Sequence, residues 1–465
     1  MTSTACRGGA ALMLLALPGL LSATVTFERR WHWNREDVGR SVVQTVDDGY
    51  LVSGQTWIGS SQYSIVLART DSLGDTTSVQ HLPGASNGSG YLCRLSGGGF
   101  VTAGVRNGPY LFARGFDDAG DSLWSYDSTR RGAVLALIAT SDGGCLIAGR
   151  DSAQDMALIR LDSAGQEQWI HSYDEPYVQG STARGVAETG DGGFILCGDA
   201  TDYMGSYIRL VRTNSAGDTV WTRLFSGPVG PSLRAVRETQ DGGFLAIGSE
   251  FDTLGNRDAL YLMRTDSSGS VVWTRNVPMP GAGTMGLAMN TTQDGGFVVA
   301  GQIDWTDSAR AWLVKLDSAA DTIWTAVLPG SGRERAVDVR QTADGGYVLA
   351  GTSDPPNDSI LLAKTDSVGY LMTGVAEDVL TEGHRRIDLS VTPNPTTGIA
   401  RVSYSAPGAA GVTLQLCDVT GRQVHLSYGL RTSPLQLDLR AISEGVYLLR
   451  LESAGRSATR KLVIE

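Results

Sequence analysis

Asparagine, aspartate and basic side chains recur at fixed intervals along this 465-residue chain. Seven Asp-x-x-Gly-like turns begin at Asp71, Asp117, Asp162, Asn214, Asp266, Asp317 and Asp366. Seven such oxygen-bearing turns could each hold a calcium ion. In short turns, however, these side chains more often accept hydrogen bonds from backbone N–H groups two residues on. We therefore predict that they are structural and hold no metal.

A basic residue precedes six of the seven turns by two positions. These residues are Arg69, Arg160, Arg212, Arg264, Lys315 and Lys364, and Gly115 is the exception. A ring of cations could bind anions. Repetition in nearly every copy instead favours an ion pair, or an apolar stem lying along each structural unit. We predict that this set is also structural.

Motifs for enzymatic chemistry are weak. Residues 84–88 fit Gly-x-Ser-x-Gly, but a nucleophile elbow needs a strand before it and a helix after it. Asp304 and Asp307 are paired carboxylates in a variable loop, where such groups are usually solvated. The five histidines, His32, His81, His171, His384 and His425, lack metal-ligand spacing. We expect no catalytic residue, metal or cofactor.

A repeat positions all of these residues. Thr-x-Asp-Gly-Gly-Phe is clearest at 239–244 and 292–297, and the first two of its seven copies are degenerate. The residue after the turn is Tyr50, Phe100, Cys145, Phe194, Phe244, Phe297 and Tyr347, at spacings of 50, 45, 49, 50, 53 and 50. A period near 50 residues indicates a repeat architecture.

Each copy contains four strand-like segments. The Asp-Gly-Gly turn joins the first two, and the Asp-x-x-Gly turn joins the last two. The second and third segments are apolar on both faces, which indicates sheets packed between other sheets. Four-stranded sheets packed around an axis meet that demand. We therefore predict an all-β fold in which residues 24–373 form a seven-bladed β-propeller of four-stranded blades.

The ends of the array indicate how the ring closes. Tryptophan stands four residues past the second turn at Trp124, Trp169, Trp221, Trp273 and Trp324, and we expect the last three to be buried between blades. The last copy lacks this strand, whereas residues 27–33 ahead of the first copy carry Trp31 and Trp33. We predict that 27–33 pairs with 360–365, which makes the strand before Asp-Gly-Gly the innermost one.

Loops of variable length should share one face of the ring, because chain direction places the inter-blade loops beside those between second and third strands. The non-repeating residues there are Trp57, Tyr63, Tyr177, Tyr203, Tyr207, Phe251, Trp305 and Arg333. Variable loops on a rigid frame commonly carry binding sites. We predict ligand contacts among them, with loop packing as the alternative.

Composition limits the partners and the compartment. A net charge of -11 argues against nucleic acid. Residues 1–23 contain Arg7 and an apolar stretch, which predicts a signal peptide, and no later apolar run is long enough to span a membrane. The remaining cysteines are Cys93, Cys145, Cys197 and Cys417. Two of them occupy core positions, so we expect packing rather than a disulfide framework.

The pattern changes after a charged linker at 374–386. Residues 387–465 carry alternating strand-like segments at 401–405, 412–417, 435–439, 446–451 and 461–464. Turn residues separate them, which is typical of a small all-β sandwich.

This segment resembles the C-terminal sorting domain of the bacterial type IX secretion system. The matching motifs are Pro393-Asn394-Pro395 with Gly398, Asp418-Val419-Thr420-Gly421-Arg422, Gly445-Val446-Tyr447-Leu448 and Lys461-Leu462-Val463-Ile464. The resemblance implies an immunoglobulin-like sandwich, contact with the type IX secretion machinery, and secretion or surface attachment. Residues 35–373 resemble the Asp-Gly-Gly-Phe propeller repeats often found ahead of such domains, which implies a fold and no activity.

These features predict an exported, monomeric binding module that recognises a glycan or protein on the variable face. One alternative is a hydrolase or lyase acting on polysaccharide at the same face, and another is a purely structural surface protein. An enzyme predicts acidic, tyrosine or histidine groups converging at the mouth of the central channel. A binder predicts an aromatic platform without them.

Overall fold

The computed structural model describes residues 25–34, 36–59, 62–85, 90–106, 108–176, 178–226, 232–252, 257–277, 282–305, 308–330, 332–353, 358–371, 388–405, 412–418, 423–430, 434–440, 442–453 and 456–464. Within these ranges every helix or strand element is a β-strand, which confirms the predicted all-β fold. The predicted signal peptide, the linker and Tyr177 lie outside them.

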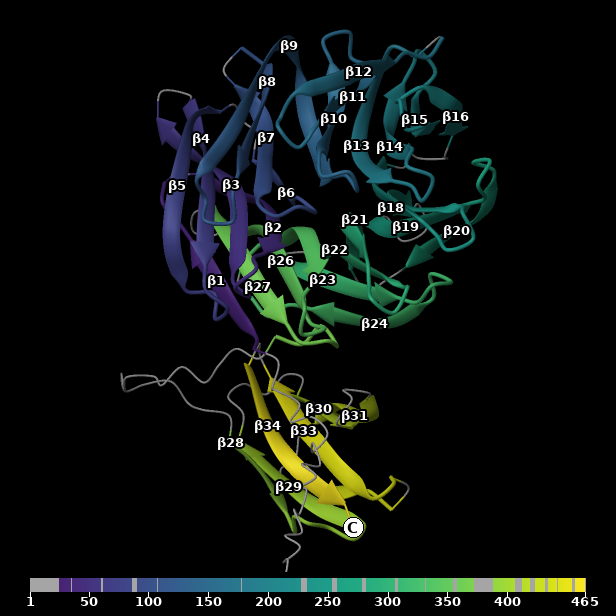
Figure 1. Cartoon of the computed structure of the whole chain (residues 1–465). Helices are drawn as coiled ribbons and strands as arrows, with labels where there is room; N and C mark the ends of the chain where they lie inside the picture. Colours follow the sequence, from purple (N-terminus) through teal and green to yellow (C-terminus); the bar gives the residue numbers. More distant parts are fainter. Residues whose placement is uncertain are drawn as a thin grey trace, which may run out of the picture.

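Strands β1 to β27 form sheets arranged in a ring (Figure 1). Three sheets each hold four consecutive antiparallel strands. One contains β13 (Gly180–Glu188), β14 (Phe194–Thr201), β15 (Ser206–Thr213) and β16 (Thr219–Ser226), and the next contains β17 (Ser232–Glu238), β18 (Phe244–Asp252), β19 (Arg257–Thr265) and β20 (Val271–Val277). The third contains β21 (Gly283–Thr291), β22 (Phe297–Trp305), β23 (Ser308–Leu316) and β24 (Thr322–Val327). A fourth joins β25 (Glu334–Gln341), β26 (Tyr347–Ser353) and β27 (Ser359–Thr365) to β1 (Phe27–Trp31).

The first three repeats form one eleven-stranded sheet. Its strands are β2 (Asp37–Gln44), β3 (Tyr50–Gly59), β4 (Gln62–Thr70), β5 (Thr76–Ala85), β6 (Tyr91–Arg94), β7 (Phe100–Arg106), β8 (Tyr110–Phe116), β9 (Ser122–Ala139), β10 (Cys145–Asp151), β11 (Met156–Leu161) and β12 (Glu167–Tyr173). Strand β9 is 18 residues long and pairs with β8 through its first half and with β10 through its second. Backbone pairing therefore links these repeats in addition to packing.

The Asp-Gly-Gly turn depends on two glycines for different reasons. In the fifth repeat the Thr239 hydroxyl donates to Asp241 Oδ1 at 2.7 Å, and Gly242 has a φ of 77°. This left-handed conformation favours glycine. A Cβ on Gly243 would instead collide with the carbonyl oxygen of Thr265 on the third strand. The turn thus needs a permissive backbone at one position and a missing side chain at the next.

The Asp-x-x-Gly turn is capped as predicted. Asp266 Oδ1 accepts the backbone N–H groups of Ser268 and Ser270, each at 2.9 Å. The equivalent pair of hydrogen bonds forms at Asp71, Asp162, Asp317 and Asp366. These aspartates therefore act as turn caps.

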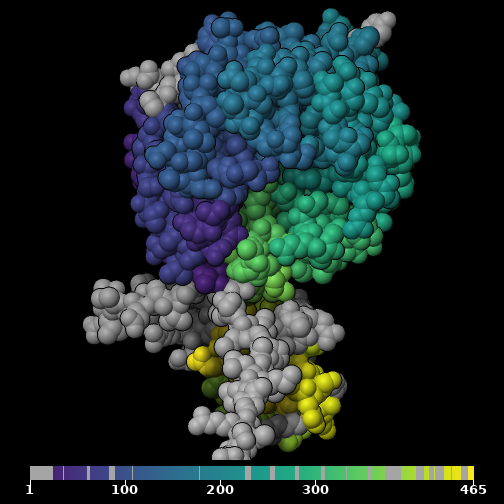
Figure 2. All heavy atoms as spheres, viewed as in Figure 1, coloured from purple at the N-terminus to yellow at the C-terminus, as the bar shows by residue number. Residues whose placement is uncertain are grey.

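The N-terminal strand closes the ring. Strand β1 pairs antiparallel with β27, from Phe27 opposite Lys364 to Trp31 opposite Ile360, as predicted. At the inner edge, the backbone N–H of Ala343 donates to Gln44 Oε1 at 2.9 Å. The purple atoms that begin the ring meet the light green atoms that end it in Figure 2.

Phe27, and not Trp31 or Trp33, occupies the place of the missing tryptophan. Phe27 is 5% exposed, and its ring lies 5.5 Å from that of Tyr50 in the next sheet. Trp31 and Trp33 stack on each other at 5.9 Å and are only half-buried. The strand register decides this, because Phe27 faces Lys364 as Trp221 faces Arg212 and Trp324 faces Lys315.

Our expectation that the repeat tryptophans are buried between blades is confirmed only in part. Trp221, Trp273 and Trp324 pack against hydrophobic cores but are half-buried. Each lies on the outermost strand of its sheet, and the guanidiniums of Arg223 and Arg275 lie over the Trp221 and Trp273 rings. Trp221 also packs on the next sheet: the ring centroids of Trp221 and Phe244 are 5.9 Å apart.

The C-terminal segment forms two sheets around one core. The first contains β28 (Asp388–Thr392), β29 (Ile399–Ser405) and β32 (Leu435–Asp438), and the second contains β31 (Gln423–Leu430), β30 (Val412–Asp418), β33 (Gly445–Ser453) and β34 (Arg456–Ile464). Their shared core contains Leu389 and Val402 of the first sheet and Leu414 and Leu449 of the second. Strands β28 and β31 were not predicted. The guanidinium of Arg450 lies 4.5 Å from the Tyr370 ring centre of the ring-forming part.

The cysteines pack rather than pair. Cys93, Cys145 and Cys197 are buried free thiols, and Cys417 is half-buried and carries no disulfide. The expected core role of Cys145 and Cys197 is confirmed.

Candidate functional site

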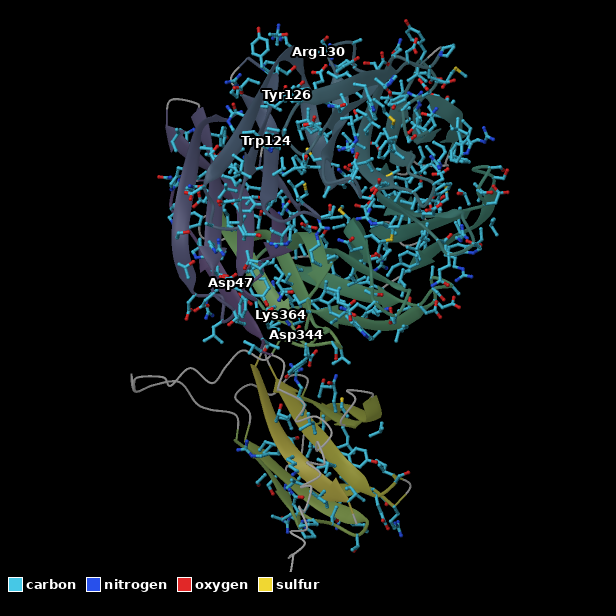
Figure 3. The ribbon with its side chains drawn as sticks, viewed as in Figure 1. Asp47, Trp124, Tyr126, Arg130, Asp344 and Lys364 are labelled. Atoms are coloured by element: carbon cyan, nitrogen blue, oxygen red, sulfur yellow. The ribbon has the colours of Figure 1, made fainter. Side chains whose placement is uncertain are left out.

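The repeated basic residues are used within their own sheets. Each reaches the Asp of the Asp-Gly-Gly turn, as predicted for an ion pair: Arg69–Asp47, Arg160–Asp142, Arg212–Asp191, Arg264–Asp241, Lys315–Asp294 and Lys364–Asp344. Figure 3 labels the last pair, whose atoms are 2.9 Å apart. These cations are therefore partnered and do not form a free anion-binding ring.

The predicted aromatic residues lie at the ends of strands in several different sheets. Trp57 and Tyr63 face each other at the end of the β3–β4 hairpin, and the Tyr63 hydroxyl donates to Glu36 Oε2 at 2.9 Å. Tyr203 is 91% exposed in the turn between β14 and β15. Tyr207 on β15 is half-buried and hydrogen-bonds to Asp202, which raises the pKa of its phenol.

The remaining candidates come from two hairpins and one inter-blade loop. Phe251 is 37% exposed on β18, Trp305 is the last residue of β22, and Arg333 is exposed before β25, where it bridges Ala309 of β23. The candidates therefore come from the first, fourth, fifth, sixth and seventh repeats. Asp304 accepts a hydrogen bond from Gln302 at 2.5 Å, whereas Asp307 and the serine of the Gly-x-Ser-x-Gly segment lie outside the described residues.

A β-bulge recurs in the innermost strand of the ring. The register of six inner strands shifts by one residue, which leaves one residue without a partner across the pair. These residues are Arg40, Leu135, Arg184, Arg234, Leu287 and Val337. Bulges re-aim a side chain and often adjoin functional sites. Three of the six positions hold arginine.

Those three arginines and Tyr91 all lie on innermost strands, close enough for their charges to act on the tyrosine. The positive charges of Arg40, Arg184 and Arg234 all act on the phenol of Tyr91, although they come from repeats on different sides of the ring. We call these four residues the axial cluster. Burial raises the pKa of Tyr91 more than the three arginines lower it, so the phenol stays protonated. All four side chains are half-buried and so retain contact with solvent.

The positive charge of the axial cluster is only partly neutralised. Arg184 forms an ion pair with Asp199. Burial and the neighbouring Arg184 lower the pKa of Arg234, while Asp199 opposes the shift. The Nε of Arg40 is buried and has no hydrogen-bond partner. Three arginines beside one carboxylate give a site suited to a bound anion, because guanidinium groups match carboxylate and phosphate geometry.

A second polar group lies closer to the turns. Arg237 donates to Asn290 Oδ1 at 3.1 Å, and Asn290 donates to the carbonyl of Val339 at 3.0 Å. Burial lowers the pKa of Arg237 to about 10, and the nearby Arg340 adds to that effect. These bonds connect neighbouring inner strands, so this group holds the ring together.

The axial cluster was not predicted from the sequence. Arg40, Arg184 and Arg234 each stand five positions before the threonine of the Thr-x-Asp-Gly-Gly motif, at Thr45, Thr189 and Thr239, which is a detectable signal. The sequence did not predict the bulge at these positions, so they were not recognised as a site.

Among the described residues, no group of three His, Cys, Asp or Glu side chains could hold a metal ion. None of the described elements is a helix long and apolar enough to cross a membrane.

The sorting motifs come together at the C-terminal strand. Asn394 donates through Nδ2 to the carbonyl of Lys461 at 2.6 Å and accepts the backbone N–H of Val463 at 2.8 Å. Tyr447 is buried and donates to the carbonyl of Ser443 at 2.7 Å. Gly445 pairs with Ile464, and Pro393 and Pro395 are exposed beside Asn394. Gly421 and Arg422 lie outside the described residues.

The ring of antiparallel sheets is a β-propeller. The BP39L lectin from Burkholderia pseudomallei superposes with a TM-score of 0.53 at 10% identity, over 73% of this chain and 98% of that one. The β-propeller domain of the Trilobed protease from Pyrococcus furiosus gives a TM-score of 0.44 at 8% identity, over 74% and 100%. YCF48 from Cyanidioschyzon merolae gives 0.43 at 12%, over 72% and 98%. At 10% identity, the BP39L lectin shows similarity of fold alone.

The C-terminal segment is more specific. Residues 390–465 match the family described as secretion system C-terminal sorting domain. This domain implies an interaction with the type IX secretion machinery, and therefore secretion or display at the cell surface. No curated protein matches the chain in sequence.

Proposed function

We propose that this protein is an exported β-propeller that binds a carboxylate-bearing ligand through the axial cluster. The observation that carries the proposal is the convergence of Arg40, Arg184 and Arg234 on Tyr91, with one carboxylate, Asp199, among them. The protein is acidic overall, with a net charge of -11, so the local excess of arginine distinguishes this site from the rest of the chain.

The architecture belongs to the same proposal. We infer seven blades, because seven pairs of recurring turns each join four strands and β1 completes the last set. The propeller then spans residues 24–373 behind a signal peptide at 1–23. A linker at 374–386 leads to an immunoglobulin-like sandwich at 387–465 that directs export. The two packed sheets of this segment support that assignment.

The axial cluster is better suited to binding than to cleaving a polysaccharide by hydrolysis or by lyase-type elimination. A nucleophilic or basic tyrosine needs a lowered pKa, whereas burial raises that of Tyr91. Asp199 is held by Arg184 and so is not free to act as an acid. A protonated phenol beside guanidinium groups is a set of hydrogen-bond donors, which is suited to holding an anion.

The ligand is expected to enter from the variable face. Arg234 is the third residue of β17, so it lies nearer to the inter-blade loop than to the Asp-Gly-Gly turn. An acidic glycan or acidic peptide reaching the axis would pass between the variable loops. Trp57, Tyr63, Tyr203, Tyr207, Phe251, Trp305 and Arg333 stay candidates for its outer contacts.

The test is an array of neutral and carboxylate-bearing glycans and peptides, read with the full chain. We expect binding to acidic ligands and a loss of about tenfold or more for Arg234→Gln and Arg184→Gln, since one such bond to a charged group contributes about 1.5–3 kcal/mol. The control is Arg401→Gln, an exposed arginine of the C-terminal segment. Equal binding by the axial variants and the control would refute the proposal.

A further inference from the structure

One repeat lacks the aromatic residue that fills the space between neighbouring sheets. On the fourth strand of other repeats, tryptophan faces the basic residue of the third strand: Trp169 faces Arg160, and Trp221 faces Arg212. In the first repeat the residue facing Arg69 on β5 is Ser78. A serine side chain fills far less volume than an indole, so the space that an indole fills in the other repeats is left open.

A cavity of about 220 Å³ lies at this place. Ser78, Leu67 and Arg69 of the first repeat line it, together with Phe100, Gly120 and Asp121 of the second.

The glycines of the Asp-x-x-Gly turns show what is missing. A Cβ on Gly165 would meet the ring of Trp124, and one on Gly269 would meet that of Trp221, whereas one on Gly120 meets nothing within 4 Å. The cavity therefore corresponds to an absent aromatic ring.

We propose that this cavity is a binding site for a planar aromatic group of indole size. The occupant is inferred from the other repeats, where an indole fills the equivalent space and packs on the aromatic residue that corresponds to Phe100, as Trp169 does on Phe194 at 5.9 Å. Leu51, Leu67 and Phe100 form an apolar wall of the cavity, and polar side chains such as Gln80 and Asp121 line the rest. Apolar surfaces in cavities bind small aromatic molecules. The site is separate from the axial cluster and does not depend on it.

The polar groups around the cavity also fit an indole. Trp221 donates from Nε1 to the carbonyl of Ser267 at 3.1 Å, and the corresponding carbonyl here belongs to Asp118. In the first repeat, which lacks the indole ring, Arg69 donates to that carbonyl. The Arg69 side chain is 20% exposed, whereas the equivalent Lys364 of the last repeat is 1% exposed. A bound ring would lie beside this guanidinium, and cation–π contact is favourable in that arrangement.

The test uses indole as the probe and isothermal titration calorimetry on the full chain. We expect saturable binding of one indole by the unmodified protein. Ser78→Trp should fill the cavity from within, weaken indole binding by about tenfold or more and raise the melting temperature. The matched control, Ser78→Ala, keeps the space open and should bind indole as before.

Two results would overturn the proposal. One is the absence of indole binding to the unmodified protein, and the other is unchanged binding by folded Ser78→Trp. Should Ser78→Trp fail to fold, Ser78→Phe provides a smaller ring with the same expected loss. N-acetyltryptophanamide is the second probe: its binding indicates a protein side chain as the natural occupant, and binding of indole alone indicates a free aromatic molecule.

Discussion

Lys364 Nζ lies 2.9 Å from Asp344 Oδ2 and also donates to the carbonyl of Thr365. The lysine side chain is 1% exposed, whereas the aspartate remains partly open to solvent. Burial lowers the pKa of Lys364, and Asp344 opposes that shift. Six repeats thus place a cation under their inner hairpin and neutralise it with the aspartate of the turn.

The first prediction is a loss of stability in acid. Hydrogen bonds from Thr189 and Arg212 hold the pKa of Asp191 at about 2, and Arg160 does the same for Asp142. Both values lie below the ordinary 3.8, so the stability these groups contribute is present above about pH 4 and is lost as the pH falls toward 2. Because the carboxylates are exposed, we expect about 1 kcal/mol from each pair.

Urea unfolding between pH 2 and 7 measures this effect. The variants Asp142→Asn and Asp191→Asn separate the contribution of these two ion pairs from that of buried groups such as Asp338. Burial raises the pKa of Asp338, so it also titrates in acid. We expect each variant to be less stable than the unmodified protein at pH 7 and the difference to shrink at low pH. A difference that does not change with pH would contradict the assignment.

The second prediction concerns ring closure. Phe27→Ala should lower the free energy of unfolding by about 3–4 kcal/mol, as expected for a buried phenylalanine. Denaturant unfolding followed by circular dichroism measures it. Val25→Ala is the control, because Val25 is 42% exposed and precedes the strand. Equal effects of the two changes would mean that β1 does not secure the ring.

The third prediction ranks the tryptophans. Trp221→Ala should cost about 2 kcal/mol because the side chain is only half-buried, whereas fully buried Trp312→Ala should cost about 3–5 kcal/mol. The same unfolding measurement gives both values. A larger loss at Trp221 than at Trp312 would show that the contact with Phe244 contributes more than burial suggests.

The fourth prediction concerns export. Removal of residues 387–465 should leave a folded propeller in the periplasm of a type IX-competent host, since the two parts have separate cores. Cell fractionation with protease accessibility measures the location. Surface display of the shortened protein would refute the role of the sorting domain.

The fifth prediction separates the axis from the variable face. With an acidic ligand from the array, Arg234→Gln should abolish most binding, while Trp57→Ala, Tyr203→Ala and Trp305→Ala should weaken it singly. The controls Asp241→Asn and Asp294→Asn lie in turns at the opposite face. Loss of binding in folded turn variants, with full affinity in the aromatic ones, would show that the two faces are assigned wrongly.

The periodic features were predictable because they arise from local chemistry. Asp-Gly-Gly and Asp-x-x-Gly specify hairpins on their own, and the apolar runs between them specify sandwiched strands. The pairing of β1 with β27 followed from counting strands.

What depends on register was not predictable. Whether Phe27 or Trp31 takes the place of the missing tryptophan depends on a shift of a few residues along one strand. The axial cluster lies at β-bulges, and no turn residue in the sequence indicates where these bulges occur. Strands β28 and β31 were missed although turn residues adjoin both. Pro393-Asn394-Pro395 follows β28, and Gly421 precedes β31.

The pairing of β1 with β27 also has a consequence for the order of folding. The partners are separated by almost the whole length of the propeller, so the contact cannot form until the last repeat exists. Long-range pairing of this kind is slow, because the entropy of closing the loop is spent before the contact forms. Until then both ends of the array present unpaired strand edges, which can join to other chains. A chain held open at this seam would therefore be the form most prone to aggregation.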